Sequence, residues 1–347
     1  MSRLLSVLIP AYDNFDVLDR CVKSILLQTY RPIEIVISDD CSPNDLSRPV
    51  RELESLLDNQ ITLRFFRQSV NLGTQDNFIF CLHESVGEYL IPFSHDNVFT
   101  DRQFMERAVS WLARNENASI YFANSIEERS MLPMLQFDQC EQFQDRPPQF
   151  VCSGDEFIRS YGLKSWGSDY LGWSQFSVVK RSISARTKAF ELPFCVDRSL
   201  AVRLDLLPDN VDAFKTVLAL NNDVVFDKVI VGLAGGPLGS YSTVSKWSIV
   251  CNEVNFLVYR AVLSQYKKSI SLTSKKAIEA YLTRCTVTRF NIKLIRHFGL
   301  SIEGYLYLVK AIKDVVFSRV RRSVRTLLNI VIGRRLTEHL RRLVNLL

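Results

Sequence analysis

The sequence predicts an α/β protein whose mostly parallel, twisted sheet is flanked by helices. Three short apolar runs, Leu4–Ile9, Ile33–Ile37 and Tyr89–Phe93, each lead into a loop that carries carboxylates. Continuous aliphatic and β-branched runs are typical of strands buried on both faces of a parallel sheet. Segments with helical periodicity separate these runs, and this alternation favours the α/β class.

The expected elements follow one another in order as far as residue 123. After the first run, apolar residues recur at positions i, i+3, i+4, i+7 and i+8, which predicts an amphipathic helix over Leu18–Leu26. The second run then completes a strand–helix–strand unit. We expect the rest of this part to form strands at 61–66, 89–93 and 120–123 and helices over 74–86 and 104–112.

The pattern becomes irregular after Asn124. Residues 125–150 are rich in Met, Gln, Asp and Pro and predict a long loop, which in compact enzymes is often a lid or substrate loop. Ser153–Glu156 predicts the cap of a short helix. We expect strands at 175–179 and 224–231 and a helix at 211–220. From residue 249 the pattern is mainly helical, so we expect one domain over 1–248 and a helical C-terminal region over 249–347.

The composition is that of a globular protein, with 47% apolar and 23% charged residues. The 8 cysteines are scattered and form no CxxC pair, which favours reduced thiols over a disulfide framework or a zinc site. The first residues lead directly into a strand, so we expect no signal peptide. No apolar run reaches the ~20 residues that span a bilayer. We therefore expect a cytoplasmic protein.

Positive charge is concentrated at the C-terminal end of the chain. Residues 315–347 hold eight arginines and one acid, a net charge of +7, whereas the whole chain carries +6. Apolar residues recur among these arginines at helical spacing, and a basic amphipathic helix is typical of binding to an anionic membrane surface. The same pattern also fits a helix packed on the first domain or a contact between two copies in a homo-oligomer. Nucleic-acid binding is disfavoured because the body of the chain has no recognition motif or basic groove.

Carboxylates follow three of the predicted strands at the point where each strand ends. Asp13 follows the first strand, Asp39 and Asp40 the second, and Asp96 the fourth. Ligands of open α/β sheets bind at the carboxyl ends of the strands. Acidic side chains there suit a divalent cation and a ligand that carries phosphate, which indicates an enzyme.

Five sequence blocks in this order and spacing resemble glycosyltransferase family 2, whose members are inverting enzymes of the GT-A fold that use nucleotide-sugar donors. The resemblance is strong over residues 4–115, loose over 150–247 and absent from the last hundred residues. The blocks are SVLIPAYD at 6–13, SILLQTY at 24–30, IVISDDCS at 35–42, NLG at 71–73 and GEYLI at 87–91.

The resemblance implies a donor site at the ends of the first strands. It places Pro10, Ala11, Tyr12 and Asp13 beside the donor, and it aligns Asp39-Asp40-Cys41-Ser42 with the family's Asp-Asp-Gly-Ser loop, whose carboxylate accepts a hydrogen bond from uracil or a similar base. Cys41 replaces the usual glycine, which leaves the conformation of this loop open. Asn71 and Gly73 are expected to shape the loop beside the nucleotide. The alternative role for these residues is turn formation and helix capping.

The family's Asp-x-Asp metal motif aligns with Ser94-His95-Asp96. Only the second acid is present, and the resemblance implies that Asp96 contacts Mn²⁺ or Mg²⁺ bound to the donor diphosphate. His95 is a candidate to assist, since imidazole binds Mn²⁺ better than Mg²⁺. Polar surface filler is the alternative role for His95.

The remaining site residues follow from looser matches to the family. The general base is expected at Asp209 or Asp212, which precede and begin the helix at 211–220, and capping of that helix is the alternative. Lys246 is a candidate contact to the diphosphate or a solvated lysine. Trp173 is a candidate to stack on the acceptor sugar, or a buried core residue.

Together these expectations describe an enzyme on the inner face of a membrane. It would transfer a sugar with inversion from a nucleotide donor, UDP-linked in the simplest case, to a glycan or lipid-linked acceptor in surface polysaccharide synthesis. One alternative is a catalytically inactive relative that binds a glycan or a partner protein. A nucleotidyltransferase is another, but it would need a Gly-rich phosphate loop near the N-terminus, where residues 10–14 read PAYDN.

Overall fold

The computed structural model describes residues 3–162, 176–183 and 211–235, and then 259, 262–263, 266 and 270–289. Contacts divide the chain into two compact units, Met1–Tyr281 and Leu282–Leu347. Of the second unit the structure describes only residues 282–289, which are the end of a helix. Within the described ranges no helix is both long and apolar enough to cross a membrane. The predicted boundary at residue 248 lies outside these ranges and stays a prediction.

The N-terminal part alternates strands and helices as the sequence predicts. Its elements are β1 (Leu5–Ala11), α1 (Phe15–Leu26), β2 (Ile33–Asp39), α2 (Ser47–Glu54), β3 (Ile61–Arg67), α3 (Thr74–Glu84) and β4 (Tyr89–Pro92). Helix α2 is the one element here that the sequence analysis missed. It is short and mostly polar, buries only Val50 and Leu53, and carries a proline in its first turn, so few apolar residues mark it in the sequence.

The second part begins with β5 (Val98–Phe99), α4 (Phe104–Arg114) and β6 (Ala118–Glu127). The 3₁₀ turns η1 (Phe137–Gln139) and η2 (Glu141–Phe143), strand β7 (Gln149–Ser153), helix α5 (Gly154–Phe157) and the π-helical turn η3 (Ile158–Gly162) follow. Beyond them the described elements are β8 (Ser177–Lys180), α8 (Val211–Ala219), β9 (Asp223–Ala234) and α10 (Leu272–Arg289).

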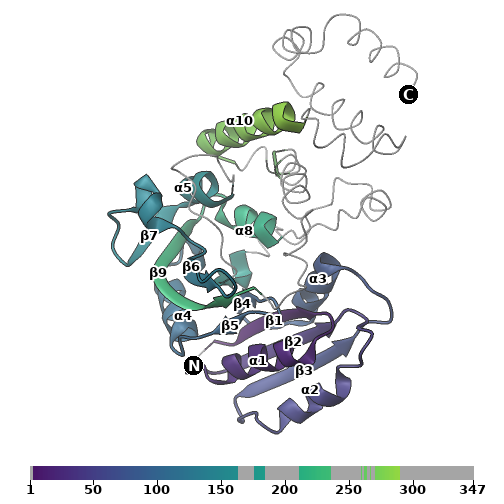
Figure 1. Cartoon of the computed structure of the whole chain (residues 1–347). Coiled ribbons are helices and arrows are strands. Elements are labelled where there is room, and N and C mark those ends of the chain that lie inside the picture. The colour runs from purple at the N-terminus through teal and green to yellow at the C-terminus, as the bar shows by residue number, and fades with distance from the viewer. Residues whose placement is uncertain are drawn as a thin grey trace, which may run out of the picture. The chain divides into compact units, whose positions relative to one another are not determined.

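The strands form one nine-stranded mixed sheet in the order β3-β2-β1-β4-β8-β6-β9-β5, with β7 paired to β9. Strands β1 to β4 pair in parallel, as predicted, and so do β6 and β9. Strand β8 is antiparallel to both β4 and β6, so β6 and β9 run in the direction of β1. Strands β1 to β4, β6 and β9 therefore end at the same side of the sheet, which we call the carboxyl edge (Figure 1).

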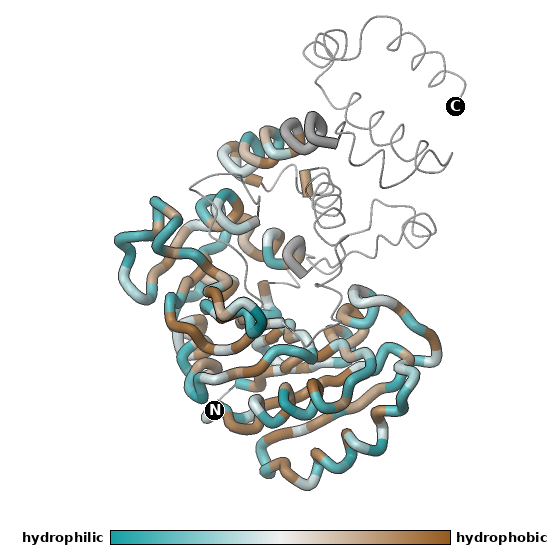
Figure 2. The backbone as a smooth tube through the Cα atoms, viewed as in Figure 1, coloured by the Kyte–Doolittle hydropathy of each residue, from teal (hydrophilic) through white to brown (hydrophobic). Residues whose placement is uncertain are grey.

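Helices cover both faces of the sheet. Helices α1, α2 and α4 share one apolar core with alternate residues of β1 and β2, such as Val7 and Ile35, and α4 itself packs on β6 and β8. Helix α3 packs on β1 and β2 and helix α8 packs on β6, where Phe78 of α3 meets Phe214 of α8 edge to face. Figure 2 shows the resulting pattern: the central strands are hydrophobic along their length, while α1 and α2 alternate between hydrophobic and hydrophilic residues.

Residues 128–148 form a long loop, as predicted, which contains two 3₁₀ turns, and part of this loop is packed on the sheet. Leu135, Phe137, Cys140 and Phe143 are buried, and the rings of Phe137 and Phe143 contact Phe226 of β9. This packing has no periodic signal in the sequence, because the aromatic residues pack individually rather than as one face of a helix or strand.

Two predictions about local structure are confirmed in the segment that follows. Ser153 and Glu156 form the expected capping box at the start of α5, and the predicted strand at 224–231 is β9. Asp155, between the two capping-box residues, accepts hydrogen bonds from the hydroxyls of Ser271 and Ser274 at the start of α10. The beginning of α10 is therefore attached to the unit that contains the sheet.

Candidate active site

The loop after β1 is held in an unusual backbone conformation at the carboxyl edge. Asp13 and Asn14 both have a positive φ of 54°, and the Asn14 side chain caps α1 by accepting from the amide of Val17. Asp13 accepts a hydrogen bond from Asn44, which lowers the pKa of the Asp13 carboxyl. Tyr12 is 47% exposed and is available to a ligand.

The loop after β2 is bound to the loop after β1 through Ser42. The Ser42 hydroxyl donates to the Asp39 carboxylate and accepts from the backbone amide of Asp13 at 2.7 Å. Cys41 has a φ of 59°, the left-handed conformation that the family's glycine adopts readily. The loop therefore keeps this conformation with cysteine at the glycine position.

Arg67 joins this cluster, although the sequence analysis did not single it out. Its guanidinium donates to Asp39 at 2.6 Å and to the Ser42 carbonyl at 2.9 Å. Asp39 is completely buried, whereas about a third of the Arg67 side chain, 33%, is exposed. The signal was available in principle, because a parallel β2–β3 pair brings the last residues of the two strands side by side, and Asp39 and Arg67 are partners in that register.

Asp40 holds the loop before α3. Its two carboxylate oxygens accept from the amides of Leu72 at 2.6 Å and Gly73 at 2.9 Å. Gly73, with a φ of 82°, also donates to the side chain of Asn71. Burial raises the pKa of Asp40, and these amide bonds oppose the shift. In the described structure Asp40, Asn71 and Gly73 therefore shape the loop together.

Asp96 lies in a tight turn between β4 and β5. The amide of Asn97 donates to the Ser94 carbonyl at 3.1 Å, so His95 and Asp96 are the two central residues of this turn. Asp96 is half-buried. Burial lowers the pKa of His95, while the charge of Asp96, the Pro10 carbonyl and the charge of Asp13 raise it. These contacts bring the Asp96 turn next to the loop after β1.

The structure thus gathers most of the predicted donor-site residues at one edge of the sheet. The binding roles of these residues stay predictions. Trp173, Asp209 and Lys246 lie outside the described residues, and for Asp212 only its place in the first turn of α8 is described.

The described residues contain no group of three His, Cys, Asp or Glu side chains that could hold a metal ion alone. A single carboxylate at the carboxyl edge is compatible with a cation that takes its other ligands from a diphosphate and water, as Mg²⁺ commonly does. The residues present therefore fit a shared cation rather than one bound by the protein alone.

Solved structures of low sequence identity share this fold. The chain resembles Staphylococcus aureus TarS 1–349 in complex with UDP with a TM-score of 0.61 and 14% identity, over 91% of this chain and 80% of that one. It also resembles the mannosyltransferase PcManGT of Pyrobaculum calidifontis, in complex with GDP-Man and Mn²⁺, with a TM-score of 0.54 and 14% identity, over 95% of this chain and 85% of that one. The mixed sheet and its carboxyl edge are thus those of the GT-A class, as predicted.

Sequence comparison identifies the family within this class. The model of the family "Glycosyl transferase family 2" matches residues 6–207, and the chain belongs to this family. A curated relative is the GalNAc(5)-diNAcBac-PP-undecaprenol beta-1,3-glucosyltransferase of Campylobacter jejuni, 29% identical over 127 residues, which are 36% of this chain and 39% of that protein. Glycosyltransferase GlyG of Streptococcus pneumoniae is 33% identical over 98 residues, 28% of this chain and 32% of that protein. The matches thus span about two fifths or less of these relatives.

Proposed function

We propose that this protein transfers a sugar, with inversion, from a UDP-linked donor to a glycan or lipid-linked acceptor in bacterial surface polysaccharide synthesis. One observation carries the proposal: the turn with Asp96 lies at the same edge of the sheet as the cluster of Asp13, Asp39, Ser42 and Arg67. This arrangement offers a metal–diphosphate contact and a polar nucleoside contact on adjacent loops.

The nucleoside part of the donor would bind the loops after β1, β2 and β3. Tyr12 offers an exposed aromatic face, and the partly exposed Arg67 offers hydrogen-bond donors beside the buried Asp39. Because Asp39 itself is buried, a base would reach the pair through Arg67 or after a small shift of it. TarS, whose fold this chain shares, has been solved in complex with UDP and with UDP-GlcNAc, which supports a uridine-linked donor.

Asp96 would hold a Mn²⁺ or Mg²⁺ ion jointly with the donor diphosphate, and the neighbouring His95 would support that loop. Such an ion neutralises the charge that develops on the leaving diphosphate. PcManGT, which shares the fold, was solved with Mn²⁺. Lys246, if it reaches the same diphosphate, would add a second positive charge.

A general base must remove the proton of the acceptor hydroxyl as it attacks the anomeric carbon from the face opposite the diphosphate. We assign this role to Asp209, with Asp212 in the first turn of α8 as the alternative. Helix α8 packs on β6, and Phe214 near its start contacts Phe78 near the start of α3, the helix that follows β3 at the carboxyl edge. Trp173 would stack on the acceptor sugar.

The acceptor would be carried on a lipid, and the enzyme would bind the cytoplasmic face of the membrane. The Campylobacter jejuni relative is named for an acceptor linked through diphosphate to undecaprenol. The basic segment 315–347 of this chain supports the same location, because its arginines would be attracted to anionic lipids.

A panel of nucleotide sugars tests the proposal. The full-length protein should be stabilised against thermal unfolding by one UDP-sugar in the presence of Mn²⁺ and should slowly hydrolyse it, and Asp96→Ala should lose the Mn²⁺-dependent part of both effects without a change in the melting temperature of the free protein. Stabilisation without turnover on any acceptor extract would favour the inactive relative. Release of pyrophosphate from a sugar phosphate and UTP would favour a nucleotidyltransferase.

A further inference from the structure

Asn97, the residue after Asp96, connects the Asp96 turn to the end of β9. Asn97 is completely buried, and its side-chain oxygen accepts a hydrogen bond from the amide of Gly235 at 3.2 Å. Gly235 is the first residue after β9 and has a φ of +95°. It is also the last described residue before the segment that contains Lys246.

The chain that follows Asn97 is fixed from two sides. On one side, α1 and the residues after it bind it: Ser24 accepts from the amide of Phe99 at 3.0 Å, and Gln28 donates to the Asp101 carbonyl at 2.7 Å. On the other side, the amides of Thr100 and Asp101 donate to the Val231 carbonyl of β9.

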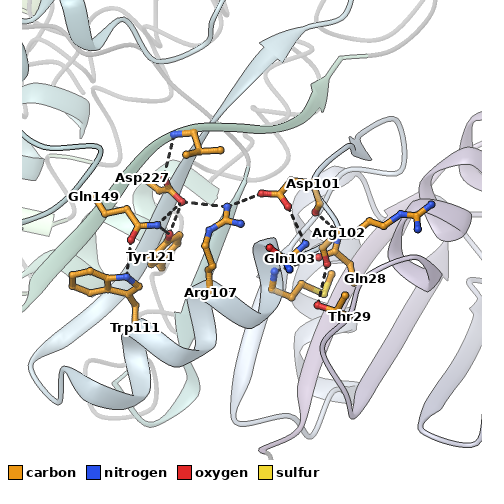
Figure 3. A network of polar contacts seen from close by, with 12 residues as sticks. Gln28, Thr29, Asp101, Arg102, Gln103, Arg107, Trp111, Tyr121, Gln149 and Asp227 are labelled. Carbon is orange, nitrogen blue, oxygen red and sulfur yellow. Dashed lines mark hydrogen bonds and ion pairs between the residues drawn. The ribbon is translucent and has the colours of Figure 1, made fainter.

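Charged side chains add to the attachment of this segment to β9. Figure 3 shows Asp101 paired with Arg107 of α4 at 2.7 Å, and Arg107 in turn facing Asp227 of β9 at 3.4 Å. Asp227 is completely buried and also accepts from the hydroxyl of Tyr121 at 2.5 Å. The residues after the Asp96 turn therefore form a rigid part of the sheet rather than a free loop.

Asn97 extends this rigidity into the turn itself. Gly232 of β9 has no room for a Cβ atom, which would lie 2.5 Å from the carbonyl oxygen of Val98, so β5 and β9 are in close contact up to the turn. The pairing of β5 with β9 covers Val98 and Phe99, and the Asn97 side chain makes the next hydrogen bond, to the amide of Gly235 after β9. Its position fixes the distance between Asp96 and the end of β9.

We propose that Asn97 is a positioning residue of the donor site. By tying the Asp96 turn to the amide of Gly235, it sets where Asp96 meets the metal ion and the diphosphate of the donor. The inference rests on the proposed function, since it assumes that Asp96 binds a cation shared with a nucleoside diphosphate. It predicts that Asn97 matters for the diphosphate and not for the nucleoside.

The test compares two substitutions of Asn97 with a matched control. Asn97→Leu keeps the number and branching of the side-chain heavy atoms and removes the acceptor, whereas Asn97→Asp keeps an acceptor oxygen. Asn124→Leu is the control, because Asn124 is also a buried asparagine that ties its strand, β6, to another segment through the Leu135 backbone. A stability effect alone would be similar in the two leucine variants.

Calorimetry on the full-length proteins measures affinity for UDP and for UMP, with Mn²⁺ and with EDTA, beside the melting temperature. Asn97→Leu should lose about tenfold or more of the Mn²⁺-dependent gain in UDP affinity, as is typical when a residue that orients a metal ligand is replaced. Its UMP affinity should be unchanged, Asn97→Asp should retain most of the gain, and Asn124→Leu should retain all of it. If Asn97→Leu does not fold, Asn97→Ser carries the same expectation.

Two results would overturn the inference. In the first, Asn97→Leu and Asn97→Ser keep the full Mn²⁺-dependent gain. In the second, Asn124→Leu loses the gain in proportion to its melting temperature, as the Asn97 variants do. A wild-type protein that binds UDP, GDP, CDP and dTDP without any Mn²⁺-dependent gain gives a different pattern, in which the metal role of Asp96 fails and the role of Asn97 fails with it.

Discussion

At the scale of single residues, the ion pair between Asp39 and Arg67 makes the first prediction. Arg67→Met leaves the buried Asp39 carboxylate without its counter-charge. We expect the free energy of unfolding to fall by about 2–3 kcal/mol, somewhat less than for a fully buried pair because Arg67 is partly exposed. Urea denaturation measures this loss, and calorimetry should show weaker UDP binding as well.

The double variant Asp39→Asn/Arg67→Met is the control for this prediction. It removes both charges and should recover part of the lost stability but not the UDP affinity. Arg48→Met, which breaks the exposed Arg48–Glu52 pair of α2, should change neither quantity. If Arg67→Met is as stable as the wild type, the pair does not hold the β2 and β3 loops together.

The raised pKa of Asp40 gives a prediction about pH. Burial raises the pKa of this carboxyl in the folded protein above its value in the unfolded chain. As the pH falls from 7 toward 4, folded Asp40 takes up a proton before unfolded Asp40 does, so the wild type should gain stability relative to Asp40→Asn over this range. Urea denaturation of both proteins at several pH values measures the difference, and parallel curves would contradict the shift.

Sequence patterns located the acidic residues of the site but not their partners. Asp96 and Asp39 were found because each directly follows an apolar strand. Arg67 and Asn97 were missed because the sequence does not show what faces them: Asp39 lies beside Arg67 only through the β2–β3 register, and Gly235 lies beside Asn97 across 138 positions of the chain. Pairings of this kind depend on the tertiary structure.

At the scale of elements, the close contact between β5 and β9 makes a prediction about two glycines. A Cβ atom at Gly232 would lie 2.2 Å from the ring of Phe176 and 2.5 Å from the Val98 carbonyl oxygen. Because Phe176 is buried and the carbonyl belongs to the backbone, neither can move easily, and we expect Gly232→Ala to cost about 3 kcal/mol of unfolding free energy.

Gly235→Ala is the matched control for this prediction. Among the described residues a Cβ atom there would meet only the Glu127 side chain at 3.9 Å, so the cost should come from the positive φ and amount to about 1–2 kcal/mol. Thermal and urea denaturation of the two variants would rank them. Equal losses would show that crowding between β5 and β9 is not the reason for glycine at position 232.

Elements with strong periodicity were predictable, and those built from tertiary contacts were not. The strands β1 to β4 and the helices α1, α3 and α4 lie where the sequence predicts them, because each has a continuous apolar run or a regular apolar stripe. Strand β5 has two residues, and β7 exists through its pairing with β9. The segment around Phe143 packs through single aromatic rings, which no periodic pattern shows.

At the scale of the whole molecule, the two halves of the sheet contribute differently to the site. The parallel half, β1 to β4, carries the loops that we propose to bind the nucleoside, and it coincides with the residues whose blocks resemble family 2. The antiparallel strand β8 joins it to β6 and β9, which hold the Asp96 turn from the other side. The metal contact that we propose for Asp96 would therefore lie where the two halves meet.

The last prediction concerns the basic segment, residues 315–347, which lies outside the described residues. A truncated protein that ends at Asp314 should no longer sediment with anionic vesicles, and salt should release the full-length protein, because exposed charges are screened beyond about 8 Å at physiological ionic strength. Hydrolysis of the UDP-sugar should survive truncation, since all the carboxylates of the proposed site precede residue 248. A full-length variant with the eight arginines replaced by glutamine controls for loss of charge without loss of chain. Aggregation of the truncated protein, or vesicle binding by the glutamine variant at low salt, would show that the segment serves the fold or an apolar contact instead of a charged membrane surface.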